Sequence, residues 1–211
     1  TQNQAFSAIL FLYRVVLERK LDWLEGVVRA KRPIRLPVVL TRHEVEAVLQ
    51  HLSGVNRLVA SLLYGSGMRL LEGLRLRVKD IDFARGEITV RDGKGRKDRI
   101  TVLPRKLNAP LADHLEKVRR RHDADLKDGL GAVELPNALA RKYRRAAFEW
   151  GWQWVFVASR HYTDRETSQR RRHHLHQSVI QRAIKEAAIK ARLAKRSSTH
   201  TLRHSFATHL L

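Results

Sequence analysis

Apolar side chains recur at helical spacing in most of the longer segments of the chain. Positions three and four apart lie on one face of an α-helix, so this repeat predicts helices that each bury one side. Glycines at positions 65 and 67 mark the end of one such segment. The segments that predict helices are 4–28, 41–52, 58–63, 68–76, about 106–121, 137–148, 177–193 and 199–211.

Two short segments instead alternate apolar and polar residues. Residues 87–91 alternate as a strand, residues 92–95 form a glycine-containing turn, and residues 99–103 alternate back. This arrangement predicts a β-hairpin. Residues 150–157 read as a turn leading into a further strand, and residues 161–172, which are polar and very basic, predict a loop. The fold class that follows is mainly α with a small antiparallel β-sheet.

A basic segment interrupts the helical pattern near the start of the chain. Residues 29–37 contain two prolines, which favour extended geometry, so they predict a linker. Its cations Lys31, Arg32 and Arg35 are expected to lie along phosphates. Thr41 and Glu44 then fit a capping box that opens a new domain. We therefore expect a helical region over 1–30, a linker over 31–40 and a larger domain over 41–211.

The charge of the chain narrows the class of partner. Lys and Arg total 42 against 21 acidic residues, which gives a formal net charge of +21. Such an excess is best explained by a polyanion, with nucleic acid first and an anionic membrane second. The apolar run over 8–17 is interrupted by Arg14 and is too short to span a bilayer. The sequence also has no cysteine. We expect a cytoplasmic protein that acts on nucleic acid.

Three short segments could together carry chemistry. They are Gly65 to Glu72, Gly93 to Arg99 and His200 to His204. Each alone also fits a plain structural interpretation: a helix end, a soluble hairpin tip and a solvated helix face. Together they fit phosphodiester transfer, because two arginines can clamp a phosphate whose oxygens gain negative charge. A lysine on a hairpin can protonate a leaving 5′ oxygen, and a histidine can assist proton transfer.

The order and the residue types of these segments resemble those of the tyrosine recombinases, which exchange DNA strands at specific sites. The likeness runs from about residue 38 to the end and is most specific over residues 200–211. It implies a tyrosine-recombinase catalytic domain preceded by the end of a helical core-binding domain, no cofactor and no metal. It also implies a homotetramer on DNA and no membrane partner. The residues that the resemblance makes catalytic are Arg69, Lys94, His200 and Arg203, with Glu72 and His204 in support.

Within that family the sequence is similar to the bacterial integron integrases. The likeness lies in an inserted stretch at about 123–162 and in the basic run that follows it. It implies cassette integration and excision at folded single-stranded as well as duplex sites, whose protruding bases can stack on aromatic or histidine rings. The alternative is that the tryptophans belong to the core and the histidines to a solvated loop. The residues expected to contact DNA, besides the linker cations, are Arg42, Arg96, Lys97, Arg99, Trp152, Trp154, Arg172, His173 and His174.

The sequence departs from the family pattern in one important respect. All four tyrosines precede the His200 segment, so none matches the place of the nucleophile. The sequence also lacks an initiator Met and stops within a helical repeat. We therefore expect a fragment that does not cleave DNA as given. Two other functions stay open: an ordinary recombinase of duplex sites, and a binding protein without catalysis. A metal site at His173, His174 and His176 is disfavoured, because arginines precede them.

Overall fold

The structure, a computed structural model, describes residues 2–21, 26, 28, 30, 36–91, 93, 97–136, 139–143 and 145–210. The chain divides into two compact units, Thr1–Leu36 and Pro37–Leu211. In the first unit, α1 (Gln2–Phe11) continues into a π-helical turn, η1 (Leu12–Val16). The helix predicted over 4–28 is confirmed as far as Val16, residues 17–21, 26 and 28 are not helical, and residues 22–25 and 27 lie outside the described residues.

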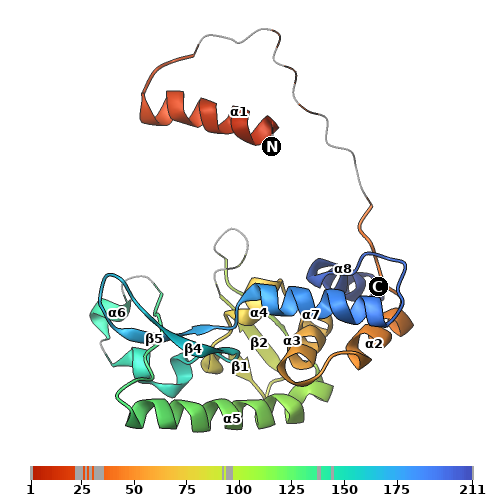
Figure 1. Cartoon of the computed structure of the whole chain (residues 1–211), viewed down its shortest axis with the longest axis vertical. Coiled ribbons are helices and arrows are strands. Elements are labelled where there is room, and N and C mark those ends of the chain that lie inside the picture. Colours follow the sequence, from red (N-terminus) through yellow and green to blue (C-terminus); the bar gives the residue numbers. More distant parts are fainter. Residues whose placement is uncertain are drawn as a thin grey trace. The chain divides into compact units, whose positions relative to one another are not determined.

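The second unit is mainly helical and holds a large apolar core (Figure 1). Leu62 and Leu63, from the helix over 54–66, and Ile180 and Ile184, from the helix over 177–190, are fully buried there. Its helices of four or more residues are α2 (Arg42–Gln50), α3 (Gly54–Ser66), α4 (Leu70–Leu74), α5 (Asn108–Lys127), α6 (Leu139–Lys142), α7 (Gln177–Lys190) and α8 (Thr199–Leu210). Among the described helices, none combines the length and the apolar content that crossing a membrane requires.

Local signals in the sequence explain where two of these helices begin and end. The Thr41 side chain accepts from the Glu44 backbone N–H, and the Glu44 carboxylate accepts from the Thr41 N–H, so the predicted capping box opens α2. Gly67 ends α3 with a φ of 64°, a left-handed conformation that favours glycine. A side chain on Gly67 would also collide with the Phe206 ring of α8. Gly67 is thus required twice, once by its backbone and once by its neighbour.

The predicted hairpin is confirmed and gains a third strand. Strand β2 (Glu87–Val90) pairs antiparallel with β3 (Arg99–Val102), in a register that sets Val90 opposite Arg99. The short strand β1 (Ile81–Asp82) pairs with the other edge of β2. Short 3₁₀ turns, η2 (Val78–Asp80) and η3 (Arg105–Leu107), flank this sheet. The sheet ends beside α3, where the Thr101 hydroxyl donates to the Ser66 carbonyl at 2.8 Å.

A second hairpin corrects the sequence interpretation. Half of the loop expected over 161–172 belongs to two paired strands, β4 (Val157–Thr163) and β5 (Arg170–His174), at one end of the unit, and residues 164–169 form the loop between them (Figure 1). The sequence hides β5 because all five of its residues are basic or histidine, although half-buried and buried positions alternate along its last four residues. The helix expected over 137–148 is reduced to α6 and a turn, η4 (Ala146–Phe148), and η5 (Trp150–Trp152) follows.

Candidate active site

The Glu72 carboxylate organises a cluster of arginines from distant parts of the chain. It lies on α4, three residues after Arg69, whose backbone N–H donates to Glu72 Oε2 at 2.7 Å. Arg69 Nη1 also donates to Glu72 Oε1 at 2.8 Å. Arg99 of β3 donates from both Nη atoms, at 3.0 and 2.7 Å. The local spacing of Arg69 and Glu72 therefore produces a side-chain pair that the strand completes.

Arg203 enters the cluster from α8. Its Nη1 donates to the Gly67 carbonyl at 2.6 Å and lies 3.7 Å from Glu72 Oε2. The glycine that ends α3 therefore also fixes the second predicted phosphate-binding arginine. Three guanidinium groups thus converge on one carboxylate, an arrangement that leaves an excess of positive charge for an anion.

Electrostatics keep the carboxylate charged. Burial alone would raise the pKa of Glu72, but hydrogen bonds from Arg99, and from Arg69, outweigh it and lower that pKa to about 2. Burial and the neighbouring Arg69 lower the pKa of Arg203, while the hydrogen bond to Glu72 raises the pKa of Arg99. Arg99 and Arg203 remain charged near neutral pH, since arginine is effectively always protonated.

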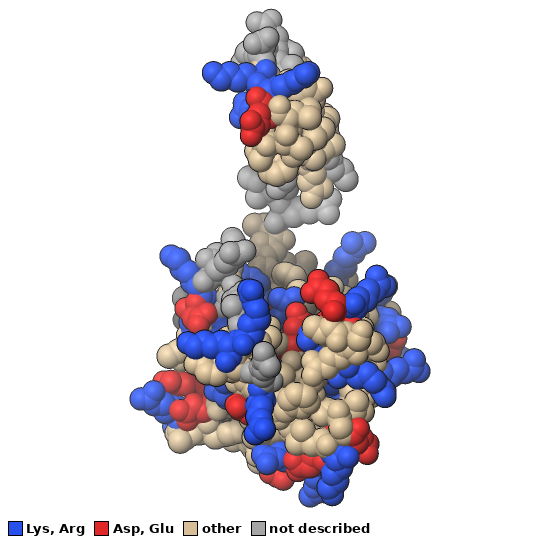
Figure 2. All heavy atoms as spheres, turned by 90° about the vertical axis from the view of Figure 1, so that its left-hand side faces the viewer, with Lys and Arg blue, Asp and Glu red and all other residues tan. Residues whose placement is uncertain are grey.

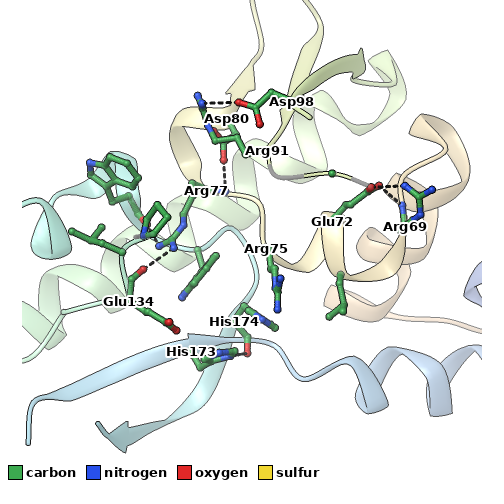
Figure 3. Close-up of a pocket in the computed structure, with 16 residues that line it drawn as sticks. Arg69, Glu72, Arg75, Arg77, Asp80, Arg91, Asp98, Glu134, His173 and His174 are labelled. Carbon is green, nitrogen blue, oxygen red and sulfur yellow. Dashed lines mark hydrogen bonds and ion pairs between the residues drawn. The ribbon is translucent and has the colours of Figure 1, made fainter. Parts of the chain in front are cut away.

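A cavity of about 860 Å³ extends from this cluster into the second half of the unit (Figure 3). Arg69 and Glu72 line one end, and His173 and His174 line the other. Figure 3 shows Arg75 between the two ends, extending towards His174. Arg75 is exposed, and its side chain makes no hydrogen bond or ion pair with a described residue. The cavity therefore joins the arginine cluster to the inserted segment that sequence analysis singled out.

The far end of the cavity is built from tryptophans and cations. The Arg77 guanidinium lies 3.3 Å from the Trp154 ring centroid, and the Lys79 ammonium lies 2.9 Å from that of Trp152. Arg77 also donates to the Trp152 and Glu134 carbonyls at 2.7 and 2.6 Å. Burial lowers the pKa of Arg77 to about 10, which leaves it charged near neutral pH. Arg77 thus cross-links η5 to the segment before α6.

Two adjacent histidines close that end, with ring centroids 4.0 Å apart. His174 meets the Trp154 ring edge-on at 5.3 Å, and its Nδ1 lies 2.8 Å from the Leu175 carbonyl, so that nitrogen donates. Burial lowers the pKa of His174 to about 4, so the ring is neutral near pH 7. His173 is half-buried and lies beside the Tyr162 ring. Of the two histidines, His173 presents more of its ring to the cavity.

A comparison with protein families matches residues 38–211 to the phage integrase family. The chain belongs to the phage integrase family. The match includes every residue of the arginine cluster and of the cavity. Two proteins named integrase/recombinase, from Escherichia coli and Pseudomonas aeruginosa, are each 49% identical to it over 211 residues. The alignment covers 100% of this chain and 63% of each relative, so the chain spans less than two thirds of their length.

Solved recombinases share this phage integrase fold. The crystal structure of XerA recombinase aligns with a TM-score of 0.54 and 26% identity, covering 100% of this chain and 62% of that one. A structure of XerH site-specific recombinase bound to its difH substrate aligns with a TM-score of 0.58 over 97% of this chain and 52% of that one. At 21% identity this second likeness concerns the fold alone. The mainly helical fold with small antiparallel sheets is that of recombinase catalytic domains.

The structure brings part of the predicted phage integrase site together. Arg69, Glu72 and Arg203 meet in one cluster. His200 and His204 are exposed on α8. Arg42 and Lys97 are exposed as well, and Arg42 donates to the His209 carbonyl at 3.1 Å. The predicted residues Lys31, Arg32, Arg35, Lys94 and Arg96 lie outside the described residues.

Three side chains predicted to contact DNA are buried, and their contact with DNA stays a prediction. Arg172 is only 7% exposed, and it spends four hydrogen bonds on Asp125 of α5 and on the Ala158 and Ser159 carbonyls. Trp154 and His174 are 6% and 7% exposed. Burial makes these residues supports of the cavity. Trp152 and His173 stay predictions, since both are half-buried on its wall.

Sequence reasoning missed the cations that line the cavity. Arg75, Arg77 and Arg91 lie on its wall, and Arg91 pairs with Asp80 at 2.7 Å. The signal was present, because basic residues alternate over 75–79 directly after the Arg69 segment. Figure 2 shows the β4–β5 end of the unit, where acidic side chains interrupt the positive charge. Charge alone therefore marks no single path for DNA on that face. In the described part, no three His, Asp or Glu side chains could hold a metal ion.

Proposed function

We propose that this chain forms the phosphate-binding part of a site-specific DNA recombinase of the tyrosine type. The observation that carries the proposal is the meeting of Arg69, Arg99 and Arg203 around Glu72, from three separate elements. Arg69 and Arg203 bind the non-bridging oxygens of the scissile phosphate and stabilise the charge that develops there. Glu72 holds the three arginines together, because its negative charge offsets their mutual repulsion.

The remaining roles follow from the family resemblance. Lys94 protonates the leaving 5′ oxygen, and His200 assists proton transfer or binds a phosphate oxygen. A tyrosine attacks the phosphodiester, forms a 3′-phosphotyrosyl link and releases a 5′ hydroxyl. Because this link conserves the energy of the broken bond, the reaction needs neither ATP nor a metal ion. His200 is exposed at the first turn of α8, where the helix dipole favours an anion.

DNA is the partner of this site, and the assembly we propose is a homotetramer around two DNA sites. Residues 1–30 belong to a core-binding domain that completes a clamp around the duplex, and residues 31–40 are its basic linker. The excess of 42 basic over 21 acidic residues supports a polyanionic partner. The proposed location of the protein is a bacterial cytoplasm, and the two integrase/recombinase relatives come from bacteria, Escherichia coli and Pseudomonas aeruginosa.

The finer proposal is an integron integrase, which recombines cassettes at folded single-stranded sites. The cavity beside the arginine cluster supports it, since its volume of about 860 Å³ could hold an unpaired nucleotide. Trp152 and His173 offer aromatic surface to the base, and Arg75 offers a cation to its phosphate. Trp152 lies in the inserted stretch and His173 in the basic run after it, and both stretches resemble the integron integrases.

Recombination is tested in a chimera in which this chain replaces the matching segment of the Escherichia coli relative, 63% of whose length it covers. We expect the chimera to nick DNA and to remain covalently attached to the 3′ end. Arg69→Ala and Arg203→Ala should each lower the cleavage rate by at least about 100-fold with DNA affinity changed far less. Arg120→Ala, an exposed change on α5, is the matched control. Loss of affinity without a specific loss of cleavage would indicate a binding protein instead.

The hypothesis of an integron integrase is tested by DNA binding of the 211-residue chain alone. One DNA hairpin carries unpaired protruding bases, and its control has the same stem fully paired. We expect tighter binding of the first hairpin, and Trp152→Ala should remove about 1–3 kcal/mol of that preference. Equal binding of both hairpins, or preference for the paired one, would favour an ordinary recombinase of duplex sites.

A further inference from the structure

We propose that Arg99 is a positioning residue of the recombinase site, which holds Glu72 so that Arg69 and Arg203 present their guanidinium groups to the phosphate. The inference rests on the proposed function and assigns Arg99 a role other than the DNA contact expected from the sequence. It concerns four residues on three elements of the second unit, all of them described by the structure.

The geometry separates Arg99 from the other two arginines. Both Nη atoms of Arg99 donate to Glu72, one to each carboxylate oxygen, at 3.0 and 2.7 Å. Arg69 uses only Nη1 for Glu72, and Arg203 uses only Nη1 for the Gly67 carbonyl. A bidentate fork fixes the plane of a carboxylate, and it leaves the same fork unable to grip a phosphate. Arg69 and Arg203 keep Nη2 without a hydrogen bond to a described residue.

The backbone that carries Arg99 is itself anchored. Arg99 opens β3, directly opposite Val90 of β2. Two residues later, the Thr101 hydroxyl donates at 2.8 Å to the Ser66 carbonyl, which immediately precedes Gly67. Arg99 and the Gly67 carbonyl that holds Arg203 are therefore tied to the same short piece of backbone. Because a hydrogen-bonded strand is rigid, Arg99 is well placed to fix the orientation of the Glu72 carboxylate.

Gly93 packs against this arrangement from the other strand of the hairpin. A side chain there would lie 2.9 Å from Arg99 Nη1 and 2.9 Å from the Lys97 carbonyl, closer than side chains normally approach. The Gly93 N–H also donates to that carbonyl at 3.2 Å. The Gly93 backbone therefore lies against the Arg99 fork, and a side chain there would also come to 3.7 Å from Glu72 Oε1, so glycine leaves the fork undisturbed.

Electrostatics indicate what happens when Arg99 is lost. Glu72 would keep Arg69 as its partner, while Arg203 already lies 3.7 Å from Glu72 Oε2. The freed carboxylate could turn towards Arg203 and draw it from the Gly67 carbonyl, so both phosphate-binding arginines would move. Among the groups that lower the pKa of Glu72, the Arg99 hydrogen bond is the strongest. Removing it should raise that pKa even where the fold is intact.

Arg99→Lys is the decisive variant, because it keeps the charge and removes the fork. In the chimera we expect cleavage to fall about 100-fold, as for a small misplacement of reacting groups. DNA affinity of the 211-residue chain should change by no more than about threefold, since the charge remains. Arg120→Lys, a change of an exposed arginine on α5 away from the cavity, is the matched control. Cleavage at the unmodified rate in Arg99→Lys, with Arg69→Ala inactive, would overturn the inference and leave the proposed function standing.

A second readout does not depend on recombination. The Glu72 carboxyl carbon is followed by NMR as pH falls in the 211-residue chain, where the unmodified protein should titrate near pH 2. Arg99→Lys and Gly93→Ala should both move this titration upwards by about one pH unit. Gly93→Ala removes no charge, so it separates the loss of the fork from the loss of a cation. An unmoved Glu72 titration in both folded variants would overturn the inference, whether or not the chimera cleaves DNA.

Discussion

The two ends of the cavity hold arginines in opposite ways. At one end a carboxylate gathers them, since Arg69, Arg99 and Arg203 all surround Glu72. At the other end Arg77 lies over the Trp154 ring and donates to the Trp152 and Glu134 carbonyls. The first end is partly exposed, with about a third of each of the three arginine side chains accessible. Arg77 at the second end is buried, with 7% of its surface exposed.

The difference shows how one residue type serves two purposes. Where the arginines are accessible, one carboxylate compensates only part of their charge, and the remainder can attract a phosphate. Where the arginine is buried, an aromatic ring and two backbone carbonyls contact it, so it acts as a structural cross-link. The partners of each arginine therefore indicate whether it binds phosphate or cross-links the structure. The sequence around the arginine does not distinguish these two roles. The following changes test that distinction, from the largest expected effect to the smallest.

Trp154→Ala should have the largest effect on stability. The ring is 6% exposed and supports Arg77, so its removal leaves a cavity and should cost about 4 kcal/mol in the free energy of unfolding. Trp152→Ala, the matched change on the half-buried neighbour, should cost about 1–2 kcal/mol. Urea unfolding of the 211-residue chain measures both. Similar costs for the two tryptophans would mean that the buried and accessible walls are not distinct.

Arg77→Met should cost about 3 kcal/mol, because it leaves two carbonyls without their donor while nearly preserving the side-chain volume. Arg75→Met, two residues earlier on the same wall, should cost no more than about 0.5 kcal/mol. The same unfolding experiment compares the two. For DNA binding the order should reverse, with Arg75→Met giving the greater loss and the greater reduction of the salt dependence.

Glu72→Gln should separate stability from binding at the accessible end. Loss of the carboxylate leaves three arginines without their counter-charge and should lower the free energy of unfolding by about 2 kcal/mol. Affinity for DNA at low salt should stay equal or increase, because the cluster becomes more positive. Fluorescence anisotropy with a labelled duplex gives the affinity, and Glu116→Gln on the exposed side of α5 is the control. A parallel fall in affinity and stability would count against a phosphate-binding role of the cluster.

The two ends should also respond to acid in different pH ranges. The pKa of His174 is about 4 in the folded chain and about 6.5 when unfolded, so the unfolded chain takes up its proton first as pH falls. Stability from this group is complete above pH 6.5, and about 2 kcal/mol should be lost between pH 7 and pH 5. Glu72, with a pKa of about 2 against 4.5, contributes above pH 4.5 and loses its contribution only below that. The free energy of unfolding is measured at several pH values from 7 to 5 for the unmodified chain and for His174→Gln. It should fall more steeply with decreasing pH in the unmodified chain.

Short-range features of this fold could be predicted from the sequence, because their partners are neighbours in the chain. The capping box of Thr41 and Glu44 spans three positions, as does the pair of Arg69 and Glu72. The stop of α3 at Gly67 and the hairpin over 87–103 also follow from local residue types. In the capping box and in the Arg69–Glu72 pair the two partners lie within about one helical turn, and the hairpin pairs strands that follow one another in the sequence.

Features that depend on distant partners were missed or misread. Arg172 resembles a DNA-binding residue in its basic run, yet its partner Asp125 lies 47 positions earlier and draws it into the interior. Arg99 meets Glu72 across 27 positions, and Arg77 meets Glu134 across 57. Charge and periodicity carry no information about such pairings, so the burial of a basic side chain and the purpose of a given arginine appear only in the folded chain.

The bond between Arg203 and the Gly67 carbonyl spans 136 positions. During translation, Arg69 and Glu72 therefore emerge from the ribosome long before Arg203, which completes the cluster, is added to the chain. During that interval the emerging polypeptide offers DNA a charged surface without a complete phosphate clamp. The phosphate-binding cluster is therefore complete only after α8 has folded onto α3.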